Sequence, residues 1–155
     1  MASSFPMEDQ RLTKRLMEYW NRLRGELPLP EWGRFNVGAL QDIWGQCCVW
    51  RVDISENDSR VNQYTFEHIG DNAKEALGKN LTGHVFVSHL ERFPGARIAN
   101  RVGETVTKAQ PISDEGSFVN EKHKMVKYRS CLLPFGTKEG RVTHVVLGLS
   151  WRTFG

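Results

Sequence analysis

Two segments near the C-terminus, residues 124–136 and 141–151, constrain the fold more than any other part of the chain. They are joined by Gly136-Thr-Lys-Glu-Gly140, where glycine at both ends makes a tight turn accessible. One face of the predicted hairpin carries side chains that alternate with a period of two: Val126, Tyr128, Ser130, Leu132, Val145, Leu147, Leu149 and Trp151. Because an isolated two-stranded hairpin is marginal in water, earlier segments must cover this face.

The composition favours a single domain in a reducing compartment. The chain has 155 residues, 39% hydrophobic and 25% charged, so it is neither disordered nor membrane-embedded. It shows no apolar run of bilayer length and no secretion signal. Three cysteines, two of them adjacent, make a poor disulfide framework. We therefore expect a cytoplasmic protein that does not enter a membrane.

An amphipathic helix is predicted from Glu8 to Arg24, within a first region of residues 1–27 that precedes the main domain at 28–155. Its apolar stripe is the predicted partner or dimer interface: Leu12, Leu16, Tyr19, Trp20 and Leu23. The stripe packs either against the chain's own sheet or against a partner helix, including that of a homodimer. The net charge of +3 is mild, so nucleic-acid binding is not favoured, although this helix is basic.

The remaining pattern predicts two strands, short helices, one longer helix and then three strands. In chain order, these are strands at 46–54 and 61–69, helices at 71–76 and 96–108, a loop at 110–116, a short strand at 117–122 and the hairpin. Helices segregated between two groups of strands indicate an α+β fold with one antiparallel sheet.

Three groups of motifs carry a resemblance to a known family. They are Tyr19-Trp-Asn-Arg-Leu-Arg-Gly-Glu-Leu-Pro28; Tyr64-Thr-Phe-Glu-His-Ile-Gly70 with Leu77-Gly-Lys-Asn-Leu-Thr-Gly83; and Tyr128-Arg-Ser-Cys-Leu-Leu-Pro-Phe-Gly136 with Val145-Val-Leu-Gly148. In this order the chain resembles the PAS domain, and specifically the single-domain PAS proteins common in alphaproteobacteria. The chain departs from that pattern at Trp32-Gly-Arg-Phe-Asn-Val37, where the family usually has an acidic, proline-containing segment.

The resemblance implies a five-stranded antiparallel sheet with short helices over one face. It also implies a sensory role in which the signal passes to a separate protein, such as a histidine kinase, a response regulator or a second-messenger enzyme. A ligand or partner would act by stabilising one arrangement of helix and sheet over another.

A small apolar ligand could bind between the sheet and its covering helices. The residues predicted to line this site are Phe66, Val85, Phe86, Ile98, Val102, Tyr128, Ser130, Leu132, Leu147 and Leu149. Ser130 and Tyr128 would supply polar groups within an otherwise apolar pocket. The alternative is a fully packed core.

Haem is a second candidate ligand. Haem-binding PAS domains ligate iron through a histidine on or near the longest helix, and His84 and His89 precede that helix here. Flavin adduct chemistry is not expected, because Leu81 stands where the photosensor family has its reactive cysteine.

Catalytic and metal-binding motifs are absent from the sequence. The histidines lack zinc-ligand spacing, the side chains of Cys47 and Cys48 would point to opposite faces of a strand, and Cys131 reads as a buried hydrophobe rather than a reactive thiol. A small isomerase or dehydratase on a curved sheet remains an alternative, but it needs an inward acid/base pair. We therefore predict a non-catalytic sensory or regulatory module.

Overall fold

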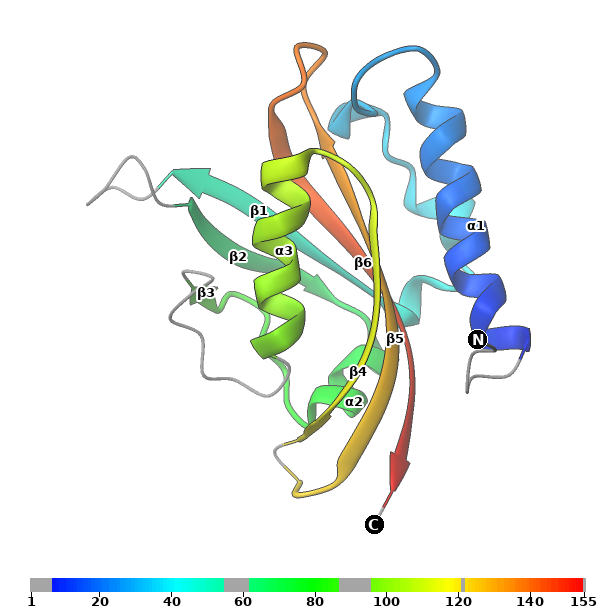
Figure 1. Ribbon diagram of the computed structural model, residues 1–155, viewed down its shortest axis with the longest axis vertical. Coiled ribbons are helices and arrows are strands. Elements are labelled where there is room, and N and C mark those ends of the chain that lie inside the picture. Colours follow the sequence, from blue (N-terminus) through cyan, green and yellow to red (C-terminus); the bar gives the residue numbers. More distant parts are fainter. Residues whose placement is uncertain (1–6, 55–61, 87–95, 121, 155) are drawn as a thin grey trace.

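The computed structural model describes residues 7–54, 62–86, 96–120 and 122–154, and one antiparallel sheet organises them (Figure 1). The order of strands across the sheet is β3-β2-β1-β6-β5-β4. The strands are β1 Cys47–Ile54, β2 Asn62–Ile69, β3 Val85–Phe86, β4 Ile112–Val119, β5 Met125–Gly136 and β6 Val142–Phe154. Five of them are long, and the two-residue β3 adds a short edge beside β2. The predicted α+β fold with an antiparallel sheet is confirmed.

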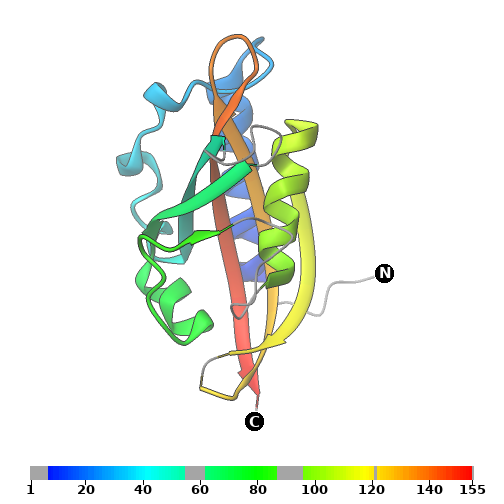
Figure 2. The same cartoon turned by 90° about the vertical axis from the view of Figure 1, so that its left-hand side faces the viewer.

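Helices cover both faces of the sheet (Figure 2). They are α1 Met7–Arg24, α2 Asp71–Leu77 and α3 Ala96–Lys108, with short 3-10 turns η1 Trp32–Arg34, η2 Val37–Leu40 and η3 Trp44–Gln46. Gly148 of β6 lies under Leu16 of α1. The next residue of β6, Leu149, lines a small void together with Ile98 of α3. Because consecutive strand residues point to opposite faces, α1 and α3 cover opposite faces. We name these the outer face, under α1, and the inner face, under α3.

The apolar stripe of α1 is buried against the outer face. Leu12, Leu16, Tyr19 and Trp20 are each at most 5% exposed, and Leu23 is partly buried. The Trp20 indole donates a hydrogen bond of 2.7 Å to the Pro134 carbonyl of β5, so the helix is held by a specific bond as well as by apolar contact. Among the described residues, no helix combines the length and apolar character that membrane crossing requires.

Strand β4 corrects the sequence prediction. Residues 110–116 were expected to form a loop and 117–122 a strand, but β4 runs from Ile112 to Val119 and pairs with β5 along its whole length. Its middle contains Asp114, Glu115 and Gly116, residue types that are depleted in strands. The backbone ladder with the long strand β5 overrides that local preference.

Candidate functional site

An apolar group at the centre of the inner face brings together four of the predicted ligand-binding residues. Phe66, Ile98, Leu147 and Leu149 line one void, with further walls from Cys48, Trp50 and Leu77. The void measures about 10 Å³, at the lower limit of the space that one water molecule needs. Since a ligand pocket usually measures several hundred Å³, this part of the inner face is a packed core.

Of the six remaining predicted residues, four lie beside this core, and Val85 and Phe86 are the exceptions. Val102, Tyr128, Ser130 and Leu132 are fully buried. Val85 is 51% exposed, so its predicted place in the pocket is wrong. It is directly opposite Thr65, which is directly opposite Arg51, and Arg51 is on the outer face with Gly148. That prediction assumed an irregular segment, whereas pairing with β2 turns Val85 to the outer face. The side chain of Phe86 lies outside the part of the chain that the structure describes.

Ser130 is a buried polar residue beside this apolar group. It is directly opposite Leu149 of β6 on one side and Asp114 of β4 on the other. Its hydroxyl oxygen is buried and has no hydrogen-bond partner among the described residues. A buried hydroxyl in that state costs about 1–3 kcal/mol relative to one that is hydrogen-bonded. Ser130 is therefore a position where a ligand group or a water molecule would gain a hydrogen bond.

An ion pair lies next to Ser130 and links the sheet to α3. The Arg101 Nε atom is 3.4 Å from the Asp114 carboxylate, and Asp114 is only 10% exposed. Directly opposed residues in an antiparallel pair have Cβ atoms about 4.5–5.5 Å apart, so Asp114 and Ser130 are close neighbours. Asp114 was missed because the loop predicted at 110–116 concealed the alternation that turns it inward. Arg101, in the predicted helix 96–108, was missed together with this partner. The inner face thus combines an apolar core with a charged and hydroxylated border.

Among the described residues, His84 does not join this group. His84 is exposed, with its ring 6.4 Å from that of Phe66, and His89 lies outside the described residues. A void of about 10 Å³ does not accommodate a haem. Within the described segments, no three histidine, cysteine or acidic side chains are grouped as a metal would require.

The three thiols are buried in the sheet. Burial raises the pKa of Cys47 and of Cys131 to about 12, and it raises the pKa of Cys48 further. A thiol that stays protonated is a weak nucleophile and a weak metal ligand, and all three are free cysteines. The interpretation of Cys131 as a small buried hydrophobe fits this environment.

An imidazole and a carboxylate do meet, but on the outer face. The His144 Nε2 atom is 3.6 Å from Glu67, and Glu67 is 3.2 Å from Arg51. Trp32 stacks on His144 with ring centroids 4.1 Å apart, so the tryptophan covers one side of the pair. Burial lowers the pKa of His144, and Glu67 opposes that effect. This imidazole–carboxylate pair therefore lies on the outer face, whereas the isomerase alternative predicts an acid/base pair that points inward.

Trp32 belongs to the connector between α1 and β1, residues 25–46, and a second histidine stacks on the same connector. His68 of β2 lies 4.5 Å from the Trp44 ring, and its Nε2 atom is buried without a hydrogen-bond partner in the described residues. Phe35 links the two tryptophans, at 4.9 Å from Trp32 and 5.5 Å from Trp44. A continuous row of aromatic and imidazole rings therefore runs across the outer face of β6, β1 and β2. Trp32 and Phe35 in this row belong to the segment where the sequence departs from the PAS pattern.

The predicted interface of α1 is occupied by the chain's own sheet. Tyr19 accepts a hydrogen bond of 2.8 Å from the Asn36 amide, which ties α1 to the connector as well. This contact is the first of the two predicted alternatives, in which the apolar stripe packs against the chain's own sheet. A dimer or partner interface through Leu12, Leu16, Tyr19, Trp20 and Leu23 stays a prediction, because the structure contains one chain.

No family model and no curated protein matches this chain. Two solved structures are similar to it over nearly its whole length. One is the PAS domain of an HTR-like protein from Haloarcula marismortui, with 11% sequence identity, a TM-score of 0.42, and coverage of 94% of this chain and 99% of that chain. The other is a variant of Vivid, with 9% identity, a TM-score of 0.48, and coverage of 98% of each chain.

Likeness of this degree carries no fold, activity or ligand to the present chain. The strand order and the placement of the helices come from the chain itself. Five long antiparallel strands, with α3 over one face and α1 over the other, give this chain the PAS-like architecture that its sequence motifs imply.

Proposed function

We propose that this chain is a non-catalytic sensory module that receives its signal at the inner face, between α3 and the strands β4 and β5. The observation that carries the proposal is the buried Ser130 hydroxyl, which has no hydrogen-bond partner in the described residues and lies beside the Arg101–Asp114 ion pair. The ligand would be a small, mostly apolar molecule with one hydrogen-bonding group that reaches Ser130.

Binding would require α3 to move. The neighbouring void is about 10 Å³, so a ligand must displace side chains such as Ile98 and Val102, both on α3. The Arg101–Asp114 ion pair crosses from α3 to the sheet and would be stretched by the same movement. Ligand affinity would then be linked to two positions of α3, which is a population shift between two conformations.

The output is a change in how the chain binds another protein. A cytoplasmic histidine kinase, response regulator or second-messenger enzyme is the class of partner that the PAS resemblance supports. A homodimer through α1 is a further expected arrangement. Non-catalytic action is favoured because the inward carboxylate of Asp114 pairs with a guanidinium rather than with an imidazole.

The experiment compares wild type with Ser130→Ala and with Ser117→Ala, a serine that is exposed on β4. Native mass spectrometry of the gently purified protein and thermal shift with a metabolite library are the two readouts. We expect wild type and Ser117→Ala to retain or respond to the same small molecule, and Ser130→Ala to lose it.

A different result would show that the inner face is only a core. If wild type carries no small molecule and responds to none, while Ser130→Ala is more stable than wild type, the hydroxyl is an unsatisfied polar group. That outcome would remove the sensory proposal without affecting the fold.

A further inference from the structure

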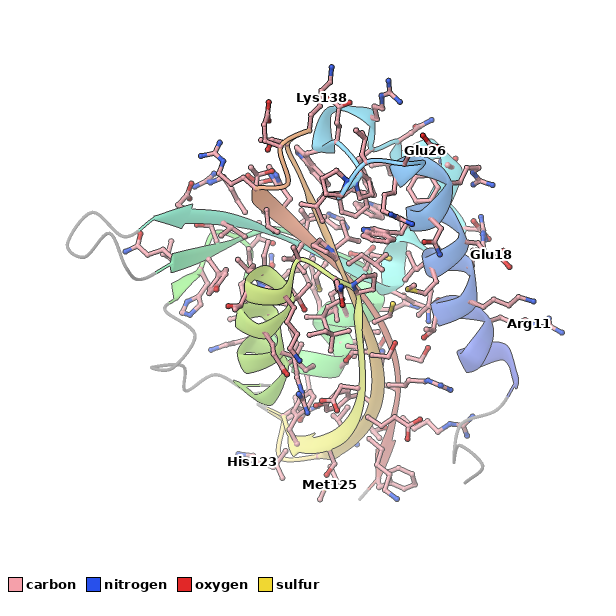
Figure 3. The ribbon with its side chains drawn as sticks, turned by 45° about the horizontal axis from the view of Figure 1, so that its top comes forward. Arg11, Glu18, Glu26, His123, Met125 and Lys138 are labelled. Carbon is pink, nitrogen blue, oxygen red and sulfur yellow. The ribbon has the colours of Figure 1, made fainter. Side chains whose placement is uncertain are left out.

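The outer face is covered by α1 at one end and exposed at the other. Gly148 of β6 lies beneath Leu16, and Cys131 of β5 is directly opposite Gly148. No register shift occurs between residues 125 and 135 of β5, so Arg129, Lys127 and Met125 follow Cys131 on this face. Lys127 and Met125 are exposed. Figure 3 shows Met125 at the end of the molecule opposite Glu26 and Lys138.

Three apolar side chains form a single row across this exposed end. Val119 of β4 is directly opposite Met125, and Met125 is directly opposite Phe154 of β6. Their exposed fractions are 54%, 41% and 48%. Single exposed apolar residues are ordinary, but three aligned across neighbouring strands form a surface that a partner can bury.

Positive charge borders this row. The adjacent row contains Ser117, Lys127 and Arg152, and both basic side chains are exposed. The Lys127 Nζ atom lies 5.3 Å from the centre of the Phe154 ring, so the charge is held against the apolar row. The next acidic residue on this face, Glu115, is 3.7 Å from Arg129 and is balanced by it.

The turn between β4 and β5 adds two lysines on the other side of the row. Lys122 and Lys124 are exposed, and Glu121, which precedes them, lies outside the described residues. The buried side chain of Asn120 accepts hydrogen bonds from both lysine amides, at 2.9 and 3.1 Å, and donates one of 3.2 Å to Ala76 of α2. The turn is therefore held in a fixed position by α2 rather than by solvent-exposed contacts alone.

We propose that Val119, Met125 and Phe154, with Lys127 and Arg152 beside them, dock an acidic amphipathic helix of a partner protein. Neighbouring strands are about 4.8 Å apart, so a row of three spans about 10 Å, which is close to the diameter of a helix. The apolar row takes the helix's apolar stripe, and the lysine and arginine face acidic residues on its flank.

The charge pattern argues for this occupant over a second copy of the chain. A copy packed face to face would bring Lys127 and Arg152 into the field of the same two cations, and like charges oppose one another. The inference rests on the proposed function only in assuming that the chain acts through another protein. It does not require a ligand at Ser130.

The probe is a synthetic helical peptide of about 18 residues, or five turns, with a leucine stripe flanked by glutamates. A matched peptide has lysine in place of each glutamate. Each is titrated into the isotope-labelled full chain, and backbone amide shifts report where it binds. We expect the acidic peptide to shift the amides of Val119, Met125 and Phe154, with affinity that falls as salt rises.

Variants separate this surface from nonspecific charge. Lys127→Glu should lower the affinity for the acidic peptide at least fivefold. The double variant Lys127→Glu with Arg152→Glu should bind the lysine peptide more tightly than the acidic peptide. Met125→Asp should weaken binding at least tenfold. Lys14→Glu, on the exposed side of α1, is the matched charge control and should leave the affinity unchanged.

Several outcomes would overturn the inference. They are the absence of binding by the acidic peptide, shifts that map to another surface, and an unchanged preference after charge reversal. Concentration-dependent shifts of the same amides without peptide would assign the surface to a second copy instead. Tighter binding of a single-stranded oligonucleotide at these amides would assign it to nucleic acid. None of these results depends on the Ser130 experiment, so failure of one proposal can be told from failure of the other.

Discussion

Leu16 of α1 lies directly over Gly148 of β6, and a Cβ atom at position 148 would overlap the Cδ1 atom of Leu16. The missing side chain is what allows the helix to approach the sheet, and it flattens the outer face between Cys47 and Cys131, the residues that pair with Gly148 on either side. One glycine therefore sets the position of α1.

Gly148→Ala should lower the free energy of unfolding by about 1–3 kcal/mol, because the extra methyl group overpacks a closed contact. In a Leu16→Ala background the same change should cost less than about 0.5 kcal/mol, since the space is then open. Urea unfolding of the two single variants and the double variant measures this coupling. Equal costs in both backgrounds would mean that Leu16 and Gly148 do not touch.

Gly70→Ala should be more damaging, at about 3 kcal/mol or more. A Cβ atom there would overlap the backbone carbonyl oxygens of Gly45 and Trp44, which cannot rotate away as a leucine can. Gly70 has φ −65°, a value open to any residue, so the requirement is for space alone. Gly33→Ala is the control, because no neighbouring atom lies within 4 Å of the added Cβ, and it should be nearly neutral. A stable Gly70→Ala variant would contradict this packing.

Ala109→Gly should stabilise the protein by about 0.5 kcal/mol, the difference between relieved backbone strain and added freedom in the unfolded chain. Ala109 follows α3 with φ +52°, a left-handed conformation in which glycine has no steric penalty. The same exchange at Ala76, inside α2, should destabilise by about 1 kcal/mol. Thermal and urea unfolding test the opposite signs, and destabilisation at both positions would rule out relief of strain at Ala109.

Stability should fall as the pH drops from 7.5 to 5.5. Burial lowers the pKa values of His68 and His144 below the usual value of about 6.5. Below that value the unfolded chain takes up protons that the folded chain does not, so the equilibrium moves toward unfolding. Glu67, Asp53 and Arg51 act on His144, while Asp71 and Lys74 act on His68, and in each case burial is the larger cause.

Replacing both histidines with glutamine should flatten this dependence. Urea unfolding at the two pH values, for wild type and for the double variant, gives the comparison. An unchanged slope in the double variant would mean that other groups are responsible. If the slope flattens, the ring stack on Trp32 and Trp44 is the acid-sensitive part of the outer face.

The sequence alone determined the α+β class, the antiparallel hairpin 124–136 and 141–151, and the amphipathic first helix with its apolar stripe. These follow from short-range patterns: alternation in strands, and the three- and four-residue spacing of apolar residues in helices. The same patterns identified Phe66, Ile98, Leu147 and Leu149 as one inner group. Each of these signals is contained within a few consecutive residues.

Only the tertiary structure decided the rest. Strand β4 exists because β5 offers a backbone ladder to residues that do not favour strands, and that pairing turns Asp114 toward Ser130 and Arg101. The row of Val119, Met125 and Phe154 likewise depends on register between three strands, which no local pattern specifies. Contacts between residues far apart in the chain depend on which strands pair and in what register, and so the polar border of the inner face and the exposed apolar row were not visible in the sequence.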